Sequence, residues 1–278
     1  MTSWLAPGHT AVITGGASGI GLAAAQLYAS QGMNVLIADL SQDTLDSALD
    51  NIQGTGTVQG FVCDVSDMSQ VEALRDHALS AFGKVDCLMN NAGAAVTRAL
   101  PWEDVAGWKK QIDINMWGVI HGCQAFVPHL LESTSKVTVI NTGSKQGITN
   151  PPGGYAYNLS KAGVVNYTQS LAHAMRQIED CPLSAHLLIP GFTYSNMIAR
   201  FMPEKPAGAW SCEEVIEYML EALKRDDFYI LCPDNDTPRD LDNKRMQWNM
   251  DDIIHNRPAL SRWHPDYAVE YEAFVADN

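Results

Sequence analysis

Short runs of β-branched and aliphatic residues alternate with amphipathic stretches along most of this chain. Apolar runs bounded by turn residues are typical of buried strands, which we expect at residues 10–14, 34–39, 58–62, 85–89, 136–140, 184–189 and 228–231. Between these runs apolar residues recur with helical spacing, which predicts helices over residues 20–28, 43–52, 71–82, 106–132, 154–178 and 213–224.

Regular alternation of strands and helices favours parallel strands joined by right-handed crossovers. We therefore expect an α/β fold with a doubly wound, Rossmann-type parallel sheet, in a single domain over residues 1–233. The alternating pattern stops near Cys232. Residues 234–278 are expected to form a C-terminal extension with one helix starting at Thr237–Pro238, packed on the domain or on a neighbouring subunit.

The chain of 278 residues carries a net charge of −14, which argues against nucleic acid and membrane surfaces as partners because both favour an excess of Lys and Arg. Its six cysteines form no Cys-x-x-Cys pair and lie mostly in apolar runs, so we expect buried free thiols and no metal site. No signal peptide is apparent, and no apolar run approaches the ~20 residues of a membrane span. These features predict a soluble, cytoplasmic protein.

A glycine-rich turn separates the first expected strand from the first expected helix, in the sequence Thr14-Gly-Gly-Ala-Ser-Gly-Ile-Gly21. Glycines let the backbone turn sharply and approach a pyrophosphate, while the helix N-terminus offers N–H groups and a positive dipole end. The alternative is a glycine-rich turn that binds no ligand. The candidate cofactor contacts in this turn are Gly15, Ser18, Gly19, Ile20 and Gly21.

Asp39 ends the second expected strand and is followed by Leu40. A carboxylate at this place can accept hydrogen bonds from the adenosine ribose, and it repels a 2′-phosphate. No Arg or Lys lies in the glycine turn or directly after Asp39, so the pattern favours NAD over NADP as the cofactor. A plain role in capping the turn at Ser41–Gln42 is the alternative for Asp39.

Two further polar segments follow expected strands, at the sheet edge where open α/β sheets bind their ligands. Asp64 and Val65 follow the third strand, and Asn91, Ala92 and Gly93 follow the fourth. Asp64 can reach an adenine amino group, and the backbone after the fourth strand offers a small platform beside a dinucleotide. Turn formation alone would also explain each segment.

Tyr157 and Lys161 stand four residues apart on an expected helix, which places both side chains on one helix face. A free tyrosine has a pKa near ~10, and a neighbouring ammonium lowers this pKa towards the range useful for acid–base chemistry. Ser144, shortly before this helix, can hydrogen-bond the same substrate oxygen. An accidental Tyr-x-x-x-Lys spacing on an ordinary helix is the alternative.

Several motifs occur together and in order: Thr14-Gly-x-x-x-Gly-x-Gly21, Asn90-Asn-Ala-Gly93, Asn115, Ser144, Tyr157-x-x-x-Lys161 and Pro190-Gly191. In this combination the chain resembles the short-chain dehydrogenase/reductase family of the compact, NAD-preferring type, over about residues 8–232. The resemblance implies that Tyr157 is the general acid/base and that Lys161 lowers its pKa and binds the nicotinamide ribose. It further implies that Ser144 orients the substrate oxygen and that Asn115 holds a water for proton relay. Residues implied to line the nicotinamide are Pro190, Gly191 and Thr193.

The segment after Pro190-Gly191 is a mobile lid in this family, here about residues 192–212. Its many apolar side chains favour a hydrophobic or aromatic substrate, although packing of a lid helix on the fold or on another subunit would also explain them. The candidate substrate contacts are Gln146, Gly154, Tyr155, Phe192, Tyr194 and Met197.

The resemblance therefore predicts an NAD-dependent oxidoreductase that transfers a hydride between nicotinamide and a small-molecule secondary alcohol or ketone. It also implies a homodimer or homotetramer, with contacts through the outer faces of the helices over residues 106–132 and 154–178. Two alternatives stay open: an NADPH-dependent carbonyl reductase, and a dinucleotide-sensing protein without turnover.

Overall fold

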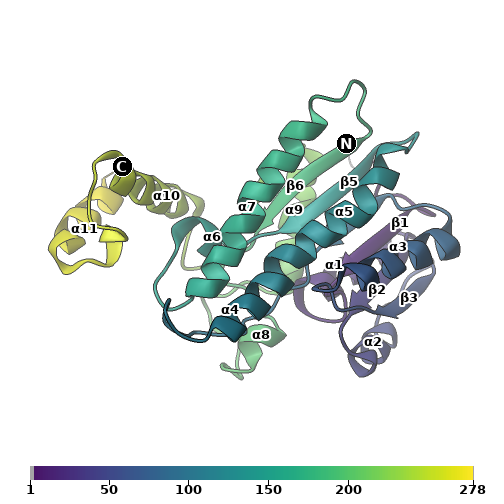
Figure 1. The fold of residues 1–278 in the computed structure, drawn as a ribbon, viewed down its shortest axis with the longest axis horizontal. Helices are drawn as coiled ribbons and strands as arrows, with labels where there is room; N and C mark the ends of the chain where they lie inside the picture. Colours follow the sequence, from purple (N-terminus) through teal and green to yellow (C-terminus); the bar gives the residue numbers. More distant parts are fainter. Residues whose placement is uncertain (1–2, 278) are drawn as a thin grey trace.

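A computed structural model describes residues 3–277 of the protein. Seven strands form one parallel sheet in the order β3-β2-β1-β4-β5-β6-β7, so the chain starts near the middle and winds outwards in both directions (Figure 1). The expected doubly wound fold is confirmed, with strand ends that lie within a residue or two of the predicted ones. The strands are β1 (Thr10–Thr14), β2 (Asn34–Asp39), β3 (Val58–Val62), β4 (Cys87–Asn90), β5 (Val137–Thr142), β6 (Leu183–Ile189) and β7 (Tyr229–Leu231).

Helices cover both faces of the sheet, because successive side chains of each strand point to opposite faces. Ile13 of β1 belongs to the core beneath α1, α2 and α9, whereas its neighbour Val12 belongs to the core beneath α3, α5 and α7. These helices are α1 (Gly19–Ser30), α2 (Gln42–Leu49), α3 (Met68–Phe82), α5 (Gly118–Leu131), α7 (Tyr155–Met175) and α9 (Cys212–Lys224).

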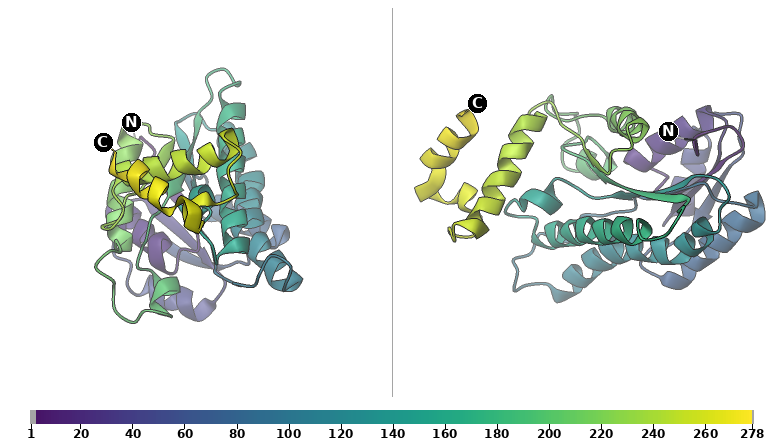
Figure 2. Two further views of the ribbon diagram at one scale, coloured as in Figure 1. Left: turned by 90° about the vertical axis from the view of Figure 1, so that its left-hand side faces the viewer. Right: turned by 90° about the horizontal axis from the view of Figure 1, so that it is seen from above.

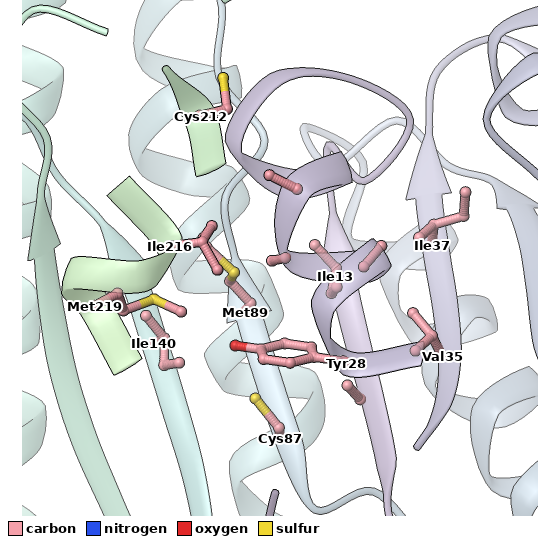
Figure 3. Close-up of a cluster of buried hydrophobic side chains, with 14 of the residues drawn as sticks. Ile13, Tyr28, Val35, Ile37, Cys87, Met89, Ile140, Cys212, Ile216 and Met219 are labelled. Atoms are coloured by element: carbon pink, nitrogen blue, oxygen red, sulfur yellow. The ribbon is translucent and has the colours of Figure 1, made fainter. Parts of the chain in front are cut away.

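The core on the first face fixes α1 and α9 against the central strands (Figure 3). Tyr28 of α1 is fully buried beside Cys87 of β4, and Ile216 and Met219 of α9 are buried in the same cluster. Burial of apolar surface stabilises the folded state by roughly 25 cal/mol per Å². The strands that carry polar residues at their carboxyl ends are therefore held by a rigid, close-packed interior.

The single helix expected over residues 106–132 is interrupted. α4 (Val105–Ile112) passes into a π-helical turn, η1 (Asp113–Trp117), before α5 begins. Such a turn inserts one residue into the helix and rotates the following side chains, and π-helical turns are frequent at functional sites. Here Asn115 lies inside the π-helical turn and is fully buried, together with Gln111 one turn before it.

The C-terminal extension contains two helices where the sequence pattern predicts one. α10 (Arg239–Ile254) starts after Pro238, as expected, and α11 (Ala268–Ala276) packs beside it after two short 3-10 turns at Ser261–Trp263 and Pro265–Tyr267. The pair projects from the body of the molecule beyond α6 (Gln146–Thr149), as Figures 1 and 2 show.

All six cysteines are free and five of them are buried, which confirms the expected free thiols. Burial raises the pKa of Cys123 to about 12, so this thiol stays protonated and unreactive at neutral pH. Among the residues that the structure describes, no helix has both the length and the apolar character needed to cross a membrane.

Candidate active site

Polar residues meet at the carboxyl ends of the three central strands. Thr14 of β1 pairs with Asn90 of β4, and Asn90 in turn pairs with Asn141 of β5. The Asn90 amide donates to Asn141 Oδ1 at 2.9 Å, and the Asn141 amide donates to Thr168 Oγ1 of α7 at 3.1 Å. These buried hydrogen bonds fix the edge of the sheet and the helix that carries Tyr157 relative to one another.

Asn91 connects the glycine turn to the end of β4. Its side-chain amide donates to the carbonyl oxygens of Thr14 and Gly15 at 3.3 and 3.2 Å. The turn is so tight that a Cβ atom on Gly21 would lie 2.2 Å from the Gly15 carbonyl oxygen. Glycine is therefore required at position 21 by the packing of helix against turn, which agrees with the role that the sequence predicts for this turn.

The N-terminus of α1 is free to receive an anion. The N-cap residue Ser18 makes no side-chain hydrogen bond to the helix, and no acidic residue lies in the first turn. The first N–H groups of a helix have no partner within the helix and point along its positive dipole end. Gly19 and Ile20 follow Ser18 at this end, so the chain provides the donors that a pyrophosphate needs.

Asp39 faces the glycine turn from the end of β2. Its carboxylate accepts hydrogen bonds from the backbone N–H of Ala17 at 3.1 Å and from that of Leu40 at 2.8 Å. Ser41, not Asp39, caps α2, since the Ser41 hydroxyl accepts from Thr44 N–H. The structure thus places Asp39 beside the glycine turn, with its hydrogen bonds made to Ala17 and Leu40.

Asp64 forms a local turn with Ser66, two residues further along the chain. Its Oδ1 accepts from both the N–H and the hydroxyl of Ser66, at 2.9 and 2.6 Å. Val65 is buried against the start of α5, where a Cβ on Gly118 would lie 2.6 Å from its Cγ2. Asp64 therefore offers a partly exposed carboxylate at the edge of the sheet, whereas the apolar side chain of Val65 is buried.

Asn115 and Lys161 approach the same point beside Gly93. A Cβ atom on Gly93 would lie 3.6 Å from Asn115 Oδ1 and 3.6 Å from Lys161 Nζ. Asn115 also bonds the loop after β4 twice, because its Oδ1 accepts from Ala94 N–H at 2.8 Å and its Nδ2 donates to Ala94 O at 3.0 Å. Asn115 is thus a buried asparagine whose amide is hydrogen-bonded, and it lies on the same side of Gly93 as the candidate catalytic lysine.

Tyr157 and Lys161 share one face of α7, as their spacing predicts. Lys161 Nζ lies 5.9 Å from the centroid of the Tyr157 ring and donates a hydrogen bond to Thr142 O at 2.8 Å. Burial lowers the pKa of Lys161 to about 8, so the ammonium is charged at neutral pH and loses its proton in mild alkali.

The pKa of Tyr157 shifts against the expected direction. Burial raises it, and a hydrogen bond with the Ser144 hydroxyl offsets only part of that rise, while Lys161 is not among the causes. In the protein alone, therefore, Tyr157 is a neutral phenol with Ser144 as its polar neighbour. This arrangement suits Tyr157 to donate a proton, and a base role requires additional positive charge or a higher pH.

Comparison with known proteins agrees with this geometry. The profile of the short chain dehydrogenase family matches residues 9–206. The chain belongs to the short-chain dehydrogenase/reductase family. It is an oxidoreductase of this family, whose members bind a nicotinamide dinucleotide.

Individual relatives and a solved structure show the same likeness. A 3-oxoacyl-(acyl-carrier-protein) reductase FabG of Thermotoga maritima is 32% identical over 199 residues, covering 71% of this chain and 79% of the relative. A 3beta-hydroxysteroid dehydrogenase 2 of Eggerthella lenta is 33% identical over 193 residues, covering 68% and 73%. The crystal structure of a short-chain dehydrogenase/reductase from Burkholderia phymatum in complex with NAD has a TM-score of 0.82 at 31% identity, covering 92% and 97%.

Backbone hydrogen bonds join the two ends of the segment expected to form a lid, residues 192–212. Tyr194 N donates to Trp210 O at 2.8 Å, and Trp210 N donates to Phe192 O at 2.9 Å. Between these points lies α8 (Asn196–Ala199), whose N-cap residue Ser195 lies next to the glycine turn, 3.3 Å from where a Cβ on Gly19 would be. The lid therefore borders the candidate dinucleotide site.

The candidate substrate residues are not all free to meet a substrate. Gln146 and Gly154 adjoin each other, since a Cβ on Gly154 would lie 3.0 Å from Gln146 Oε1. The Tyr194 hydroxyl donates within the lid to Pro203 O at 2.7 Å, so it is already engaged. The remaining candidates are all partly buried, and they are Tyr155 at the start of α7, Phe192 at the start of the expected lid and Met197 in α8.

The nicotinamide-side candidates lie where β6 ends. Pro190 and Thr193 are buried, and Thr193 Oγ1 donates to Gly191 O at 3.3 Å. Pro190 O accepts from the backbone N–H of Lys145, the residue after Ser144, at 3.1 Å. The serine loop and the Pro-Gly turn are thus directly connected, which sequence spacing alone does not indicate.

Two polar residues near the site were missed by the sequence analysis. Gln111 bonds the loop after β4, because its Nε2 donates to Ala94 O and its Oε1 accepts from Val96 N–H at 2.6 Å. Its position one helical turn before Asn115, within the same apolar stripe, was a usable signal. Lys145 gave no such signal, since its partners lie far along the chain.

Replacing Asn115 with alanine is expected to lower the free energy of unfolding by about 2–3 kcal/mol, because Ala94 N–H and C=O both lose a buried partner. Urea unfolding followed by circular dichroism measures the change. Asn51→Ala is the matched control, since that amide donates to Ser47 O on an exposed helix end and should change stability by less than ~0.5 kcal/mol. Equal effects of the two substitutions would contradict this reading of Asn115.

Proposed function

We propose that this protein is an NAD(H)-dependent dehydrogenase/reductase that transfers a hydride between nicotinamide and a secondary alcohol or ketone. The observation that carries the proposal is the meeting of Ser144, Tyr157 and Lys161 at the carboxyl edge of the sheet, opposite the uncapped end of α1. Turnover of secondary alcohols with NAD⁺, compared between the wild type and Tyr157→Phe, tests it.

Tyr157 is the proton donor and acceptor of the proposed reaction. In the direction of reduction, its neutral phenol donates a proton to the substrate oxygen as the carbonyl becomes an alcohol. In the direction of oxidation, the same atom accepts that proton. Ser144 orients the substrate oxygen towards Tyr157, which holds the reacting groups in alignment. When bound, the nicotinamide ring supplies or accepts the hydride.

Lys161 and Asn115 support this proton transfer. The Lys161 ammonium binds the nicotinamide ribose, and its charge stabilises the Tyr157 phenolate that forms during the reaction. Asn115, next to Lys161 at the Gly93 platform, holds a water that relays the proton to solvent. The buried position of Lys161 makes its positive charge more effective than it would be in water.

The dinucleotide is held along the carboxyl edge of the sheet. The glycine turn and the N-terminus of α1 bind the pyrophosphate, the ends of β2, β3 and β4 bind the adenosine half, and the Pro-Gly turn binds the nicotinamide half. The proposed cofactor contacts are Gly15, Ser18, Gly19, Ile20, Gly21, Asp39, Leu40, Asp64, Val65, Asn91, Ala92, Gly93, Tyr157, Lys161, Pro190, Gly191 and Thr193.

Asp39→Ala is expected to shift the cofactor preference from NAD⁺ towards NADP⁺ by roughly tenfold or more. Two charges ~4 Å apart at an effective dielectric of ~20 repel each other by about 4 kcal/mol, and the partial exposure of Asp39 reduces this value. The ratio of kcat/KM for NAD⁺ to that for NADP⁺ measures the preference.

The control for this experiment is Asp43→Ala, which removes the same charge from an exposed position in the first turn of α2. The control should leave the ratio of kcat/KM values unchanged, because salt screens the interaction between an exposed carboxylate such as Asp43 and a bound 2′-phosphate. A wild type that prefers NADP⁺, or an Asp39→Ala variant with the wild-type ratio, would contradict the assignment and favour an NADPH-dependent carbonyl reductase.

We further propose that the substrate is hydrophobic or aromatic. The lid of residues 192–212 carries exposed apolar side chains at Phe201 and Met202, and the Arg98 guanidinium lies 5.4 Å from the Phe201 ring centroid across from it. The hydroxysteroid dehydrogenase named above acts, by its name, on a bulky apolar alcohol. The proposed substrate contacts are Gln146, Gly154, Tyr155, Phe192, Tyr194 and Met197.

The proposed assembly is a homodimer or homotetramer. Trp117, the last residue of the π-helical turn directly before α5, is 43% exposed, and Leu159 of α7 is 52% exposed, so large apolar side chains lie on the outer face of each of these two helical segments. Burial of such faces between two copies is a usual way to form a symmetric dimer. Residues 1–233 form the catalytic domain of each copy, and residues 234–278 form its extension.

A further inference from the structure

A buried ion cluster joins the loop after Ser144 to the C-terminal extension. Lys145 Nζ lies 3.0 Å from Asp234 Oδ2 and 2.6 Å from Asp242 Oδ2. The three side chains are only 12%, 6% and 3% exposed. Charges so far from water are costly unless they are paired with good geometry, so this arrangement requires that all three members be present.

One arginine of the extension, Arg245, also acts on Asp242. Arg245, whose guanidinium donates to Thr237 Oγ1 at 3.2 Å, is close enough to favour the charged form of Asp242. Burial pushes the pKa of Asp234 upwards, but Lys145 and the Phe192 N–H outweigh it and leave that pKa below its usual value. For Asp242, burial raises the pKa despite Lys145. Asp234 is thus the more firmly charged partner of Lys145.

The cluster touches both loops that the proposed reaction uses. Lys145 follows Ser144 directly, and its backbone N–H donates to Pro190 O. Asp234 Oδ2 accepts from Phe192 N–H at 3.2 Å. Gly191 is packed so closely that a Cβ atom there would lie 2.6 Å from Asp234 Oδ2 and 3.0 Å from Lys145 Nζ. The serine loop and the Pro-Gly turn therefore share one ion pair.

The two helices of the extension pack closely on each other, and this packing holds Asp234 and Asp242 in place. Trp248 of α10 is 2% exposed, with the Arg257 guanidinium 3.9 Å from its ring centroid and Tyr271 and Phe274 of α11 against its other sides. α10 meets α6, where Asn249 Nδ2 donates to Ile148 O at 3.4 Å. A rigid helix pair of this kind can fix the position of Asp242 relative to the serine loop.

We propose that Lys145 is a positioning residue, which Asp234 and Asp242 hold so that Ser144 and the Pro190–Phe192 turn keep the relative placement that hydride transfer needs. The inference rests on the proposed function and assigns part of the active-site geometry to the C-terminal extension. Lys145 acts through Ser144 and the Pro-Gly turn and does not itself touch the reacting atoms.

The test compares Lys145→Met, Lys145→Arg and wild type by kcat, by KM for the alcohol and by NADH affinity from cofactor fluorescence. Lys145→Met should lower kcat by about tenfold or more, because small misplacements of aligned groups cost rate steeply. KM and the Kd for NADH should stay within about threefold of wild type. Lys145→Arg should recover most of kcat, since it restores the charge. Lys224→Met, in an exposed pair with Glu221, is the control and should change none of these values.

Asp242→Asn tests the same link from the extension and remains informative if Lys145→Met does not fold. It removes one charge without changing the shape of the side chain, and it should also lower kcat with little change in KM. A folded Lys145→Met or Asp242→Asn enzyme with wild-type kcat would overturn the inference, as would a loss of kcat no larger than that of Lys224→Met. An inactive wild type would instead overturn the proposed function itself.

Discussion

Replacement of Tyr157 with phenylalanine is expected to reduce turnover by about a thousandfold or more while NADH still binds. Phenylalanine keeps the ring on α7 and removes only the hydroxyl that donates and accepts the proton. Ser144 and Lys161 remain, but we expect neither to replace the phenol. The Lys161 amine in particular is already hydrogen-bonded to Thr142 O. Steady-state oxidation of a secondary alcohol, with NADH affinity measured separately, gives both values.

Tyr155→Phe is the matched control for this substitution. Tyr155 stands two residues earlier on the same helix, where it lies off the face that Tyr157 and Lys161 share. It should keep kcat within about threefold of wild type, with any effect appearing in KM. Tyr157→Phe with wild-type turnover, or equal losses in both variants, would remove Tyr157 from the role of general acid/base.

Lys161→Met is expected to reduce turnover by about a hundredfold or more and to change how stability depends on pH. The loss of turnover follows from the proposed role of Lys161, in which its charge stabilises the Tyr157 phenolate that forms during the reaction. The pKa of Lys161 falls from 10.5 to about 8 on burial, so a buried charge opposes folding at neutral pH. A shift of this size corresponds to about 3 kcal/mol.

The direction of this effect follows from proton counting. Below about pH 8 the lysine is protonated in both states, so the folded and unfolded states differ by no proton. Between about 8 and 10.5 the unfolded state binds more protons than the folded state, so the free energy of unfolding rises with pH. Above 10.5 both states have lost the proton and the rise ends.

Urea unfolding of the wild type and Lys161→Met at several pH values across this interval measures the contribution. Other groups titrate there as well, but both proteins share them, so the difference between the two free energies isolates Lys161. That difference should move in favour of the wild type by about 3 kcal/mol over the full interval. A difference that stays constant with pH would show that Lys161 is not a desolvated ammonium.

The fold could be predicted from the sequence because its determinants are local and repeated. Each strand is a short apolar run, helices separate successive strands, and the preference for right-handed crossovers reduces the sheet topologies that fit this pattern to a few, among them the doubly wound sheet. The common location of the residues at the carboxyl ends of the strands then follows from the parallel topology. Asp39, Asn91 and Ser144 are brought to one edge by the parallel order of the strands, with no knowledge of side-chain contacts needed.

The π-helical turn could not be predicted, since its cause is tertiary. The sequence through residues 106–132 has an uninterrupted helical period, and the turn coincides with long-range hydrogen bonds from Asn115 and Gln111 to the loop after β4. The second helix of the extension has a similar origin. α11 is short, and its contacts with Trp248 supply stability that its own sequence lacks.

Long-range charge pairing is the other feature that sequence reading missed. Lys145 and Asp234 are 89 positions apart, and nothing in either local sequence marks them as partners. The direction of the Tyr157 pKa shift was missed for a related reason. Spacing places Lys161 near the phenol, but it does not show that burial raises the pKa of Tyr157 by more than the hydrogen bond with Ser144 lowers it.

The most direct test of the account is the formation of NADH by the wild-type protein with NAD⁺ and a panel of secondary alcohols, aromatic and bulky ones first. We predict that NADH absorbance rises in proportion to the alcohol oxidised, that NAD⁺ is used better than NADP⁺, and that Tyr157→Phe shows binding of NADH without turnover. Tight binding of NADH by the wild type with no turnover of any alcohol or ketone would contradict the account and indicate a dinucleotide-sensing protein.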